Sequence, residues 1–299
     1  MGTLFEILIY GRDKRNLSAA ARQALHQIVK LDNQLSRWKS GSEIAWINQY
    51  AAEEPVRVEP ELFRLLVRSR EIWSETKGAF DITVAPLVKA WGFYKKEGRL
   101  PSKKEIKSAL DIVGMNHVLL DEEESTVSFD RPGIEIDLGG IGKGYAVDRA
   151  AEFLRMCKVE AALVNSGAST MYAIGSPPRQ EAWHIGVRDP HDENKAIATV
   201  ALRDGSVSTS GAPEKVFEIG GKKHSHILDP RTGFPTKGMV SATAIAPSAT
   251  DTDALATAFY ILGADWTRAY CETHKDVKAV LIPEADGKEK PRIVVINFN

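Results

Sequence analysis

Strand patterns follow one another in runs along this chain, and this order is what most limits its fold. Chains that alternate strands with helices build parallel sheets, whereas consecutive strands build antiparallel or mixed sheets. After the middle of the chain, short apolar segments of strand character are expected at residues 161–164, 183–187, 197–202, 216–219 and 240–245. The sequence therefore predicts an α+β fold with mixed or antiparallel sheets and packed helices.

Helices and hairpins are expected around these strands. Apolar side chains recur at helical spacing in residues 17–35 and 62–73. Shorter helices are predicted at 104–110 and 145–154, and strands at 4–10 and 134–138. Hairpins are predicted where 118–120 meets 126–129 and where 277–282 meets 293–298. No repeat or clear linker interrupts the pattern, so we expect one compact, two-lobed domain over residues 1–299.

The composition argues against some binding partners, although it excludes few functions. The 299 residues carry 39 Lys and Arg against 40 Asp and Glu, a net charge of −1. Such a balance gives no global electrostatic reason to bind nucleic acid or an anionic membrane. No apolar run approaches the length of a membrane span. The first residues read as a strand without a basic region or cleavage site. We therefore expect a cytoplasmic protein, or a periplasmic or membrane-anchored one if a leader has been removed.

An acid- and threonine-rich turn leads into an alanine-rich helix at residues 248–262. Asp253 and Thr257 are four residues apart, so they share one helical face. Hard oxygen ligands beside the backbone amides of a helix start suit Mg²⁺ and a phosphate. A simpler alternative is that Ser248, Asp251 and Asp253 cap the helix. Both interpretations remain open from the residues alone.

A second segment, residues 137–148, joins a strand to a helix through four glycines. Glycine-rich turns of this kind bring a backbone close to phosphates. The spacing fits neither a P-loop nor a dinucleotide fingerprint, and the glycines can equally serve a tight turn and close packing. Lys143 within the turn favours a diphosphate, which a cation there would bind.

Three further segments offer polar groups. His226 precedes the turn formed by Asp229 and Gly233, at the end of a short apolar strand, where it can orient or deprotonate a hydroxyl. Asp81 is an isolated acid in an apolar setting, and it either caps the following segment or holds part of a nucleotide. Residues 207–211 supply hydroxyls, but no serine-nucleophile motif surrounds them.

Together these segments resemble the FAD:protein FMN transferase family, also called the ApbE or flavin transferase family. The similarity covers nearly the whole chain, and it is specific because the segments occur in the family's order. The matching segments are residues 1–3, 35–48, 79–81, 137–146, 208–211, 226–230 and 253–257.

The resemblance implies a bilobed α+β fold that binds FAD and Mg²⁺ and transfers FMN from FAD to a Ser or Thr hydroxyl of an acceptor flavoprotein, with release of AMP. It implies that Asp253, Thr257 and the carbonyl of Gly140 bind the metal. His226 is implied at the flavin-phosphate end, as base or positioning group. The implied FAD contacts are Met1, Ala79, Phe80, Asp81, Asp137 and Lys143.

The chemistry of these groups agrees with that activity. Breaking a phosphoanhydride requires neutralised charge on the diphosphate and an in-line hydroxyl, which Mg²⁺, Lys143 and the acceptor would provide. Two alternatives remain. An FAD pyrophosphatase would use the same site with water as the nucleophile, and a flavin-binding protein would hold FAD without turnover.

Overall fold

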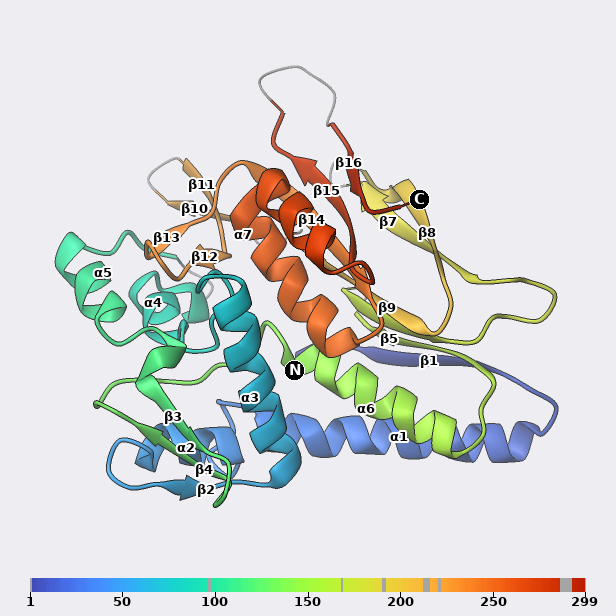
Figure 1. The fold of residues 1–299 in the computed structure, drawn as a ribbon, viewed down its shortest axis with the longest axis horizontal. Coiled ribbons are helices and arrows are strands. Elements are labelled where there is room, and N and C mark those ends of the chain that lie inside the picture. The colour runs from blue at the N-terminus through green and yellow to red at the C-terminus, as the bar shows by residue number, and fades with distance from the viewer. Residues whose placement is uncertain are drawn as a thin grey trace. The chain divides into compact units, whose positions relative to one another are not determined.

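The computed structural model describes residues 2–95, 98–167, 169–189, 192–211, 216–219, 222–285 and 292–298 (Figure 1). The chain forms two compact units, and each is assembled from separate segments. The first unit contains Met1–Asp32, Ile141–Pro213 and Gly238–Asn299. The second contains Asn33–Gly140 and Glu214–Lys237.

A seven-stranded sheet forms the centre of the first unit, with strand order β1-β5-β6-β9-β14-β15-β16. Every neighbouring pair in this sheet is antiparallel. The antiparallel sheet expected from the runs of strands is thus confirmed. Its strands are β1 (Phe5–Tyr10), β5 (Ala161–Ser166), β6 (Thr170–Ile174), β9 (Gly205–Ser210), β14 (Met239–Ala246), β15 (Lys278–Pro283) and β16 (Val294–Ile296).

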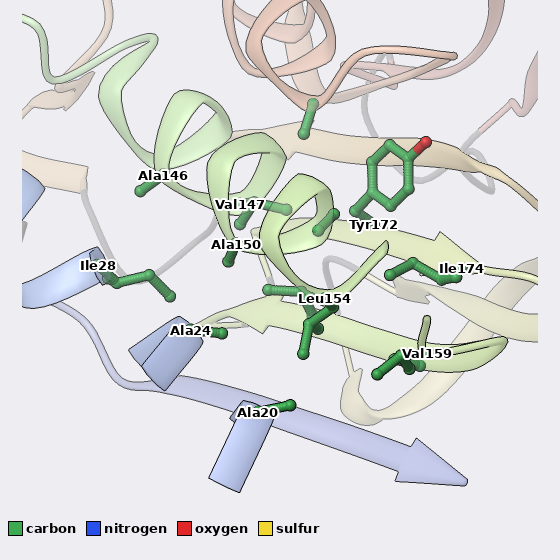
Figure 2. Close-up of a cluster of buried hydrophobic side chains, with 14 residues drawn as sticks. Ala20, Ala24, Ile28, Ala146, Val147, Ala150, Leu154, Val159, Tyr172 and Ile174 are labelled. Carbon is green, nitrogen blue, oxygen red and sulfur yellow. The ribbon is translucent and has the colours of Figure 1, made fainter. Parts of the chain in front are cut away.

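Helices cover one face of this sheet. They are α1 (Lys14–Leu35), α6 (Gly142–Met156) and α7 (Ala249–Thr273), the last with a break in its helical backbone at Gly263. Ala20, Ala24 and Ile28 recur four residues apart along α1, and they pack in one buried cluster with Val147, Ala150 and Leu154 of α6 (Figure 2).

A separate hairpin packs on the other face. Strands β7 (Trp183–Asp189) and β8 (Asp192–Leu202) pair only with each other among the described residues. Trp183, Ile185 and Val200 of the hairpin are buried against Ala173 and Val207 of the sheet. Since successive side chains of a strand point to opposite faces, β6 and β9 each supply one row to the hairpin and the other row to the helices.

The second unit is built from short helices and small sheets. Its strands form a three-stranded sheet in the order β2-β4-β3 and two hairpins, β10-β11 and β12-β13. Leu87, Trp91, Phe93, Ile106 and Leu228 form one of its buried clusters. The helices are α2 (Glu43–Tyr50), α3 (Pro60–Glu75), α4 (Ala85–Ala90) and α5 (Lys103–Leu110), with 3₁₀ turns η1 (Phe93–Lys95) and η2 (Met115–His117). The strands are β2 (Val56–Arg57), β3 (Val118–Asp121), β4 (Thr126–Phe129), β10 (Val216–Ile219), β11 (Lys222–Ser225), β12 (Leu228–Asp229) and β13 (Phe234–Pro235).

Most predicted elements are present, but one predicted strand is absent and one predicted helix begins earlier than expected. Residues 134–138 are not a strand, although apolar and acidic residues alternate there. Instead, the side chain of Asn48 bonds both backbone groups of Ile136, at 2.7 Å to its nitrogen and 2.9 Å to its oxygen. The helix expected to begin at residue 145 begins at Gly142, which places Lys143 in its first turn. In the described part of the chain, no helix is long and apolar enough to cross a membrane.

Candidate active site

Helices α6 and α7 cap each other in the first unit. A helix leaves its first backbone N–H groups without partners inside the helix. The Gly144 N–H of α6 donates to Asp253 Oδ2 on α7 at 3.0 Å. In return, Asp148 on α6 accepts bonds from the N–H groups of Ala249 and Thr250, both at 2.8 Å. The two acids thereby fix the start of each helix against the other.

Lys143 and Asp253 form a partly buried ion pair at this junction. Lys143 Nζ lies 3.0 Å from Asp253 Oδ1 and 3.3 Å from Oδ2. The side chains are only 22% and 7% exposed. Thr170 Oγ1 donates a further bond to Oδ1 at 3.3 Å. A carboxylate has about four acceptor positions, so two contacts from Lys143, one from Gly144 and one from Thr170 occupy them all.

The capping alternative is therefore partly confirmed. Ser248 caps α7, since its side chain accepts a bond from the Asp251 N–H. Asp253, however, caps α6 and not its own helix. This leaves Asp253 with a role that local helix capping does not explain, because it joins two segments that are 109 residues apart.

Gly144 makes this arrangement possible by allowing the two helices to approach each other. A Cβ atom added at Gly144 would lie 2.0 Å from the Ala249 carbonyl oxygen and 2.8 Å from Asp253 Cβ. Real Cβ atoms do not come so close to backbone atoms. One of the four glycines of the segment is thus required for packing, as the simpler interpretation of that segment expected.

Asp148 is expected to be a main stabiliser of the junction. Its carboxylate also accepts bonds from the hydroxyls of Ser248 at 2.9 Å and Thr250 at 2.7 Å. Burial raises the pKa of Asp148, and the bonds from Thr250, Ala249 and Ser248 oppose that rise. Asp148→Ala would leave these donors unpaired, so we expect it to lower the free energy of unfolding by about 2–3 kcal/mol.

Urea denaturation can measure this effect against Glu152→Ala on the same helix. Glu152 forms an exposed ion pair with Arg149, and such pairs contribute about 0–1 kcal/mol. If Asp148→Ala costs no more than Glu152→Ala, the cross-capping of α7 is not a major source of stability.

Thr257 lies one turn after Asp253, on the helical face that the sequence predicted. Its Oγ1 is 3.1 Å from Ser210 Oγ and 3.4 Å from the backbone oxygen of Asp253. Asp253 and Thr257 thus offer a carboxylate and a hydroxyl from the same helix. Oxygen donors of this kind suit a small hard cation such as Mg²⁺.

The oxygen donors of Asp253 and Thr257 suit a hard cation such as Mg²⁺ more than a softer metal. Among the described residues, no group of three or more His, Cys, Asp or Glu side chains comes together that could hold a metal ion, so a metal here would need hydroxyl, backbone or substrate oxygens besides Asp253. Lys143 Nζ already places a positive charge on the Asp253 carboxylate. A metal bound to Asp253 would have to take over acceptor positions that Lys143 now occupies.

In the second unit, Asp81 is buried in a network of its own. Thr83 donates to Asp81 Oδ1 through its backbone N–H at 2.7 Å and through its hydroxyl at 2.6 Å. Bonds from Trp73 and the Met115 backbone also reach the carboxyl group. Asp81 does not cap α4, whose N-cap residue is Val84. Its contacts instead tie the end of α3 to the η2 turn.

Asp81 is expected to make stability depend on pH. Burial raises the pKa of Asp81 to about 6, from an ordinary value of 3.8. The folded state therefore binds more protons than the unfolded state between these pH values, and the free energy of unfolding falls as pH rises through this window. The loss is on the order of 3 kcal/mol. Asparagine does not titrate, so Asp81→Asn removes this contribution.

Urea denaturation of both proteins from pH 4 to pH 7 provides the measurement. The stability of the parent relative to Asp81→Asn should decrease as pH rises, and it should level off above pH 6. A relative stability that stays constant or increases with pH would show that the folded-state pKa is not raised.

Asp137 also has partners inside the second unit. Its Oδ1 accepts a bond from the Gly139 N–H at 2.9 Å, and its Oδ2 lies 3.2 Å from Arg37 Nη1. Its own N–H donates to the Ile82 carbonyl at 2.7 Å. The Arg37 guanidinium lies 4.5 Å from the ring centre of Tyr94. The segments around Asp81 and Asp137, which are distant in sequence, are thus hydrogen-bonded neighbours.

His226 lies in the bend between β11 and β12 and is half-buried. The preceding strand, Lys222–Ser225, is polar and not apolar as expected. The predicted turn is confirmed, since the N–H groups of Thr232 and Gly233 both donate to the Asp229 carbonyl oxygen. Arg231 binds the Asp229 carboxylate through two bonds of 2.9 and 2.8 Å.

The predicted site residues are divided between the units. The first unit brings Lys143, Asp253 and Thr257 together. Met1 lies outside the described residues. The second unit contains Ala79, Phe80, Asp81, Asp137, Gly140 and His226.

Ala79 and Phe80 are buried. The sequence predictions missed the partners of Asp253 and Thr257. Thr170 and Ser210 contact these two residues. Ser210 lies in the hydroxyl-bearing segment 207–211 that the sequence singled out, but its contact with Thr257 was not predicted, and no pattern pointed to Thr170.

Comparison with known proteins identifies the family. The ApbE family profile matches residues 1–281. A Klebsiella pneumoniae FAD:protein FMN transferase is 31% identical over 94% of this chain and 86% of its own length. A Treponema pallidum protein of the same name is 32% identical, over 94% of this chain and 82% of its own length.

Solved structures agree with this result. The crystal structure of an ApbE protein from Thermotoga maritima matches with a TM-score of 0.88 and 33% identity, over 99% of this chain and 94% of its own. The flavin transferase ApbE from Vibrio cholerae matches with a TM-score of 0.86 and 26% identity, over the same shares of the two chains. The fold, the sequence match and the order of the segments lead to one conclusion: the chain belongs to the ApbE family.

Proposed function

We propose that the protein transfers FMN from FAD to a Thr or Ser hydroxyl of an acceptor flavoprotein, in a Mg²⁺-dependent reaction that releases AMP. The observation that carries this proposal is the partly buried Lys143–Asp253 pair, with Thr257 one turn away, in a chain of the ApbE family. The relatives named FAD:protein FMN transferase support the reaction type.

Asp253, Thr257 and the Gly140 carbonyl would hold the metal. When bound, Mg²⁺ neutralises charge on the diphosphate and polarises the phosphoryl group. A metal on Asp253 would displace Lys143, because the acceptor positions of the carboxylate are already occupied. Lys143 would then be able to bind the diphosphate of FAD from the first turn of α6.

The remaining proposed residues bind FAD or move a proton. Met1 and the segment from Ala79 to Asp81 would bind FAD together with Asp137. The acceptor hydroxyl oxygen forms a bond to the FMN phosphorus, the phosphoanhydride bond breaks, and AMP leaves with that bond's electron pair. An imidazole nitrogen of His226 would accept the hydroxyl proton or hold the hydroxyl in line. Alignment of FAD and acceptor would contribute much of the rate enhancement.

Mass spectrometry of the products tests this function directly. The protein is incubated with FAD, Mg²⁺ and a threonine-bearing acceptor, and in parallel with the same acceptor carrying valine at that position. Transfer predicts AMP and an FMN adduct on the threonine acceptor only, with both lost on addition of a chelator. AMP with free FMN and an unmodified acceptor would indicate an FAD pyrophosphatase, and unchanged FAD would indicate a binding protein.

A further inference from the structure

Strand β9 presents a row of hydroxyls to helix α7 in the first unit. Ser206, Ser208 and Ser210 alternate along the strand, so their side chains share one face. Thr252 Oγ1 of α7 lies 2.8 Å from both Ser206 Oγ and Ser208 Oγ. One turn further along the helix, Thr257 Oγ1 lies 3.1 Å from Ser210 Oγ. The strand therefore contacts the helix through hydroxyls on both sides of Asp253.

The row also reaches the Asp253 carboxylate. Ser208 pairs with Thr170 of β6 in the sheet register. Ser208 Oγ donates to Thr170 Oγ1 at 3.1 Å, and Thr170 Oγ1 donates to Asp253 Oδ1 at 3.3 Å. Thr170, Ser208 and Thr252 are at most 1% exposed. Water therefore does not replace these bonds, and the side chains depend on one another.

Counting protons gives the chain of hydroxyls a direction. A hydroxyl has one proton to donate, and a carboxylate can only accept. Thr170 uses its proton on Asp253, so it must accept a bond from Ser208. Ser208 has then used its own proton on Thr170. The bonds from Ser208 to Thr170 and from Thr170 to Asp253 both point toward the carboxylate, and aligned hydrogen bonds polarise and strengthen one another.

The same count leaves Thr257 able to bind a metal. Its proton is directed to the backbone oxygen of Asp253 at 3.4 Å. Ser210 can then donate to one lone pair of Thr257 Oγ1, and the second lone pair stays available. Ser210 thus restrains the rotation of Thr257 without occupying the whole oxygen atom.

We propose that Thr170, Ser208 and Ser210 are positioning residues, which orient the Asp253 carboxylate and the Thr257 hydroxyl for Mg²⁺. This inference rests on the proposed function, because Asp253 and Thr257 are its metal ligands. Groups that hydrogen-bond to metal ligands typically change metal affinity by about 10–100-fold when removed. The role differs from general stabilisation of the sheet, which any buried hydroxyl pair can provide.

Such a pair exists on the opposite face of the same strand and supplies the control. Thr209 Oγ1 and Thr243 Oγ1 are 2.8 Å apart, and neither residue appears in the bonds that lead to Asp253 or Thr257. Thr209→Val removes one interstrand hydroxyl bond from β9, as Thr170→Val does from β6. A loss of affinity caused only by weaker folding would affect both variants.

Binding of Mn²⁺, used as a probe for Mg²⁺, can be followed by electron paramagnetic resonance of the free ion, with and without FAD. Thr170→Val should weaken binding by about 10–100-fold and Ser210→Ala by about 10-fold. Thr209→Val should bind like the parent. Thr170→Ser, which keeps the hydroxyl, should restore most of the affinity. Circular dichroism establishes that each variant is folded, and Ser208→Ala provides a second test if Thr170→Val does not fold.

The outcomes separate this inference from the proposed function. If the parent binds Mn²⁺ and Thr170→Val and Ser210→Ala bind it equally well, the positioning role is wrong and the metal site stands. If Thr209→Val loses as much affinity as Thr170→Val, the effect is structural, and the positioning role is again wrong. A parent protein that binds no Mn²⁺ under either condition would overturn the metal site and this inference together.

Discussion

Asp253→Asn is expected to lower the rate of FMN transfer by about 10³-fold, because it removes the only carboxylate in the proposed metal site. The asparagine amide also presents N–H donors where Lys143, Gly144 and Thr170 all donate to the native side chain. The variant thus loses the negative charge that would bind the metal. Its amide N–H groups also face the N–H and O–H donors of the neighbouring residues, so hydrogen bonds are lost. We expect a stability loss of about 1–3 kcal/mol from these unpaired donors.

The measurement combines AMP release, adduct formation and FAD binding. Asp253→Asn should still bind FAD, since the other proposed contacts are intact, but it should form almost no adduct. Asp251→Asn is the matched control, because Asp251 lies in the first turn of the same helix and has no proposed catalytic role. If Asp253→Asn transfers FMN within about tenfold of the parent rate, then the Asp253 carboxylate does not bind a metal that the reaction needs.

The sequence predicted elements well where the pattern is local and regular. The long amphipathic helices and the 118–129 hairpin depend on side-chain period and turn residues, and the structure confirms them. The segment at 134–138 shows where such patterns fail. Its apolar and acidic residues alternate as in a strand, but the backbone of Ile136 is bonded by the side chain of Asn48, 88 residues away. Nothing in the local sequence distinguishes a strand from an irregular segment whose backbone is bonded by a distant side chain.

The candidate site shows the same limit. Asp253 and Thr257 could be placed on one helical face from their spacing alone, and Ser248 could be recognised as a cap. That Asp253 caps α6 could not be predicted, because it depends on how closely two helices approach. Lys143 was expected in a turn, but it lies in a helix, because α6 begins at Gly142. The N-cap residue, Ile141, makes no side-chain capping bond, so the sequence offered no capping residue that marks this start.

Gly144→Ala is expected to destabilise the protein strongly, which is opposite to the usual effect of this substitution. In an exposed helix interior, replacing glycine by alanine stabilises by about 1 kcal/mol. At Gly144 the new Cβ would lie 2.0 Å from the Ala249 carbonyl oxygen, which belongs to the backbone of α7 and cannot rotate away. Either α7 moves or the first turn of α6 unwinds, and both changes break the bonds from Gly144 and Lys143 to Asp253. We expect a loss of about 3 kcal/mol or more, at the upper end for overpacked sites.

Urea denaturation and Mn²⁺ binding of Gly144→Ala test this expectation together. Gly41→Ala is the control, because a Cβ added there would have no atom within 4 Å, so its stability should change little. Gly144→Ala should lose stability and metal affinity in parallel, since the helix contact and the orientation of Asp253 depend on the same missing side chain. A variant as stable as the parent would mean that α6 and α7 do not approach as closely as described. In that case the mutual capping by Asp148 and Asp253, and the geometry of the proposed metal site, would also have to be abandoned.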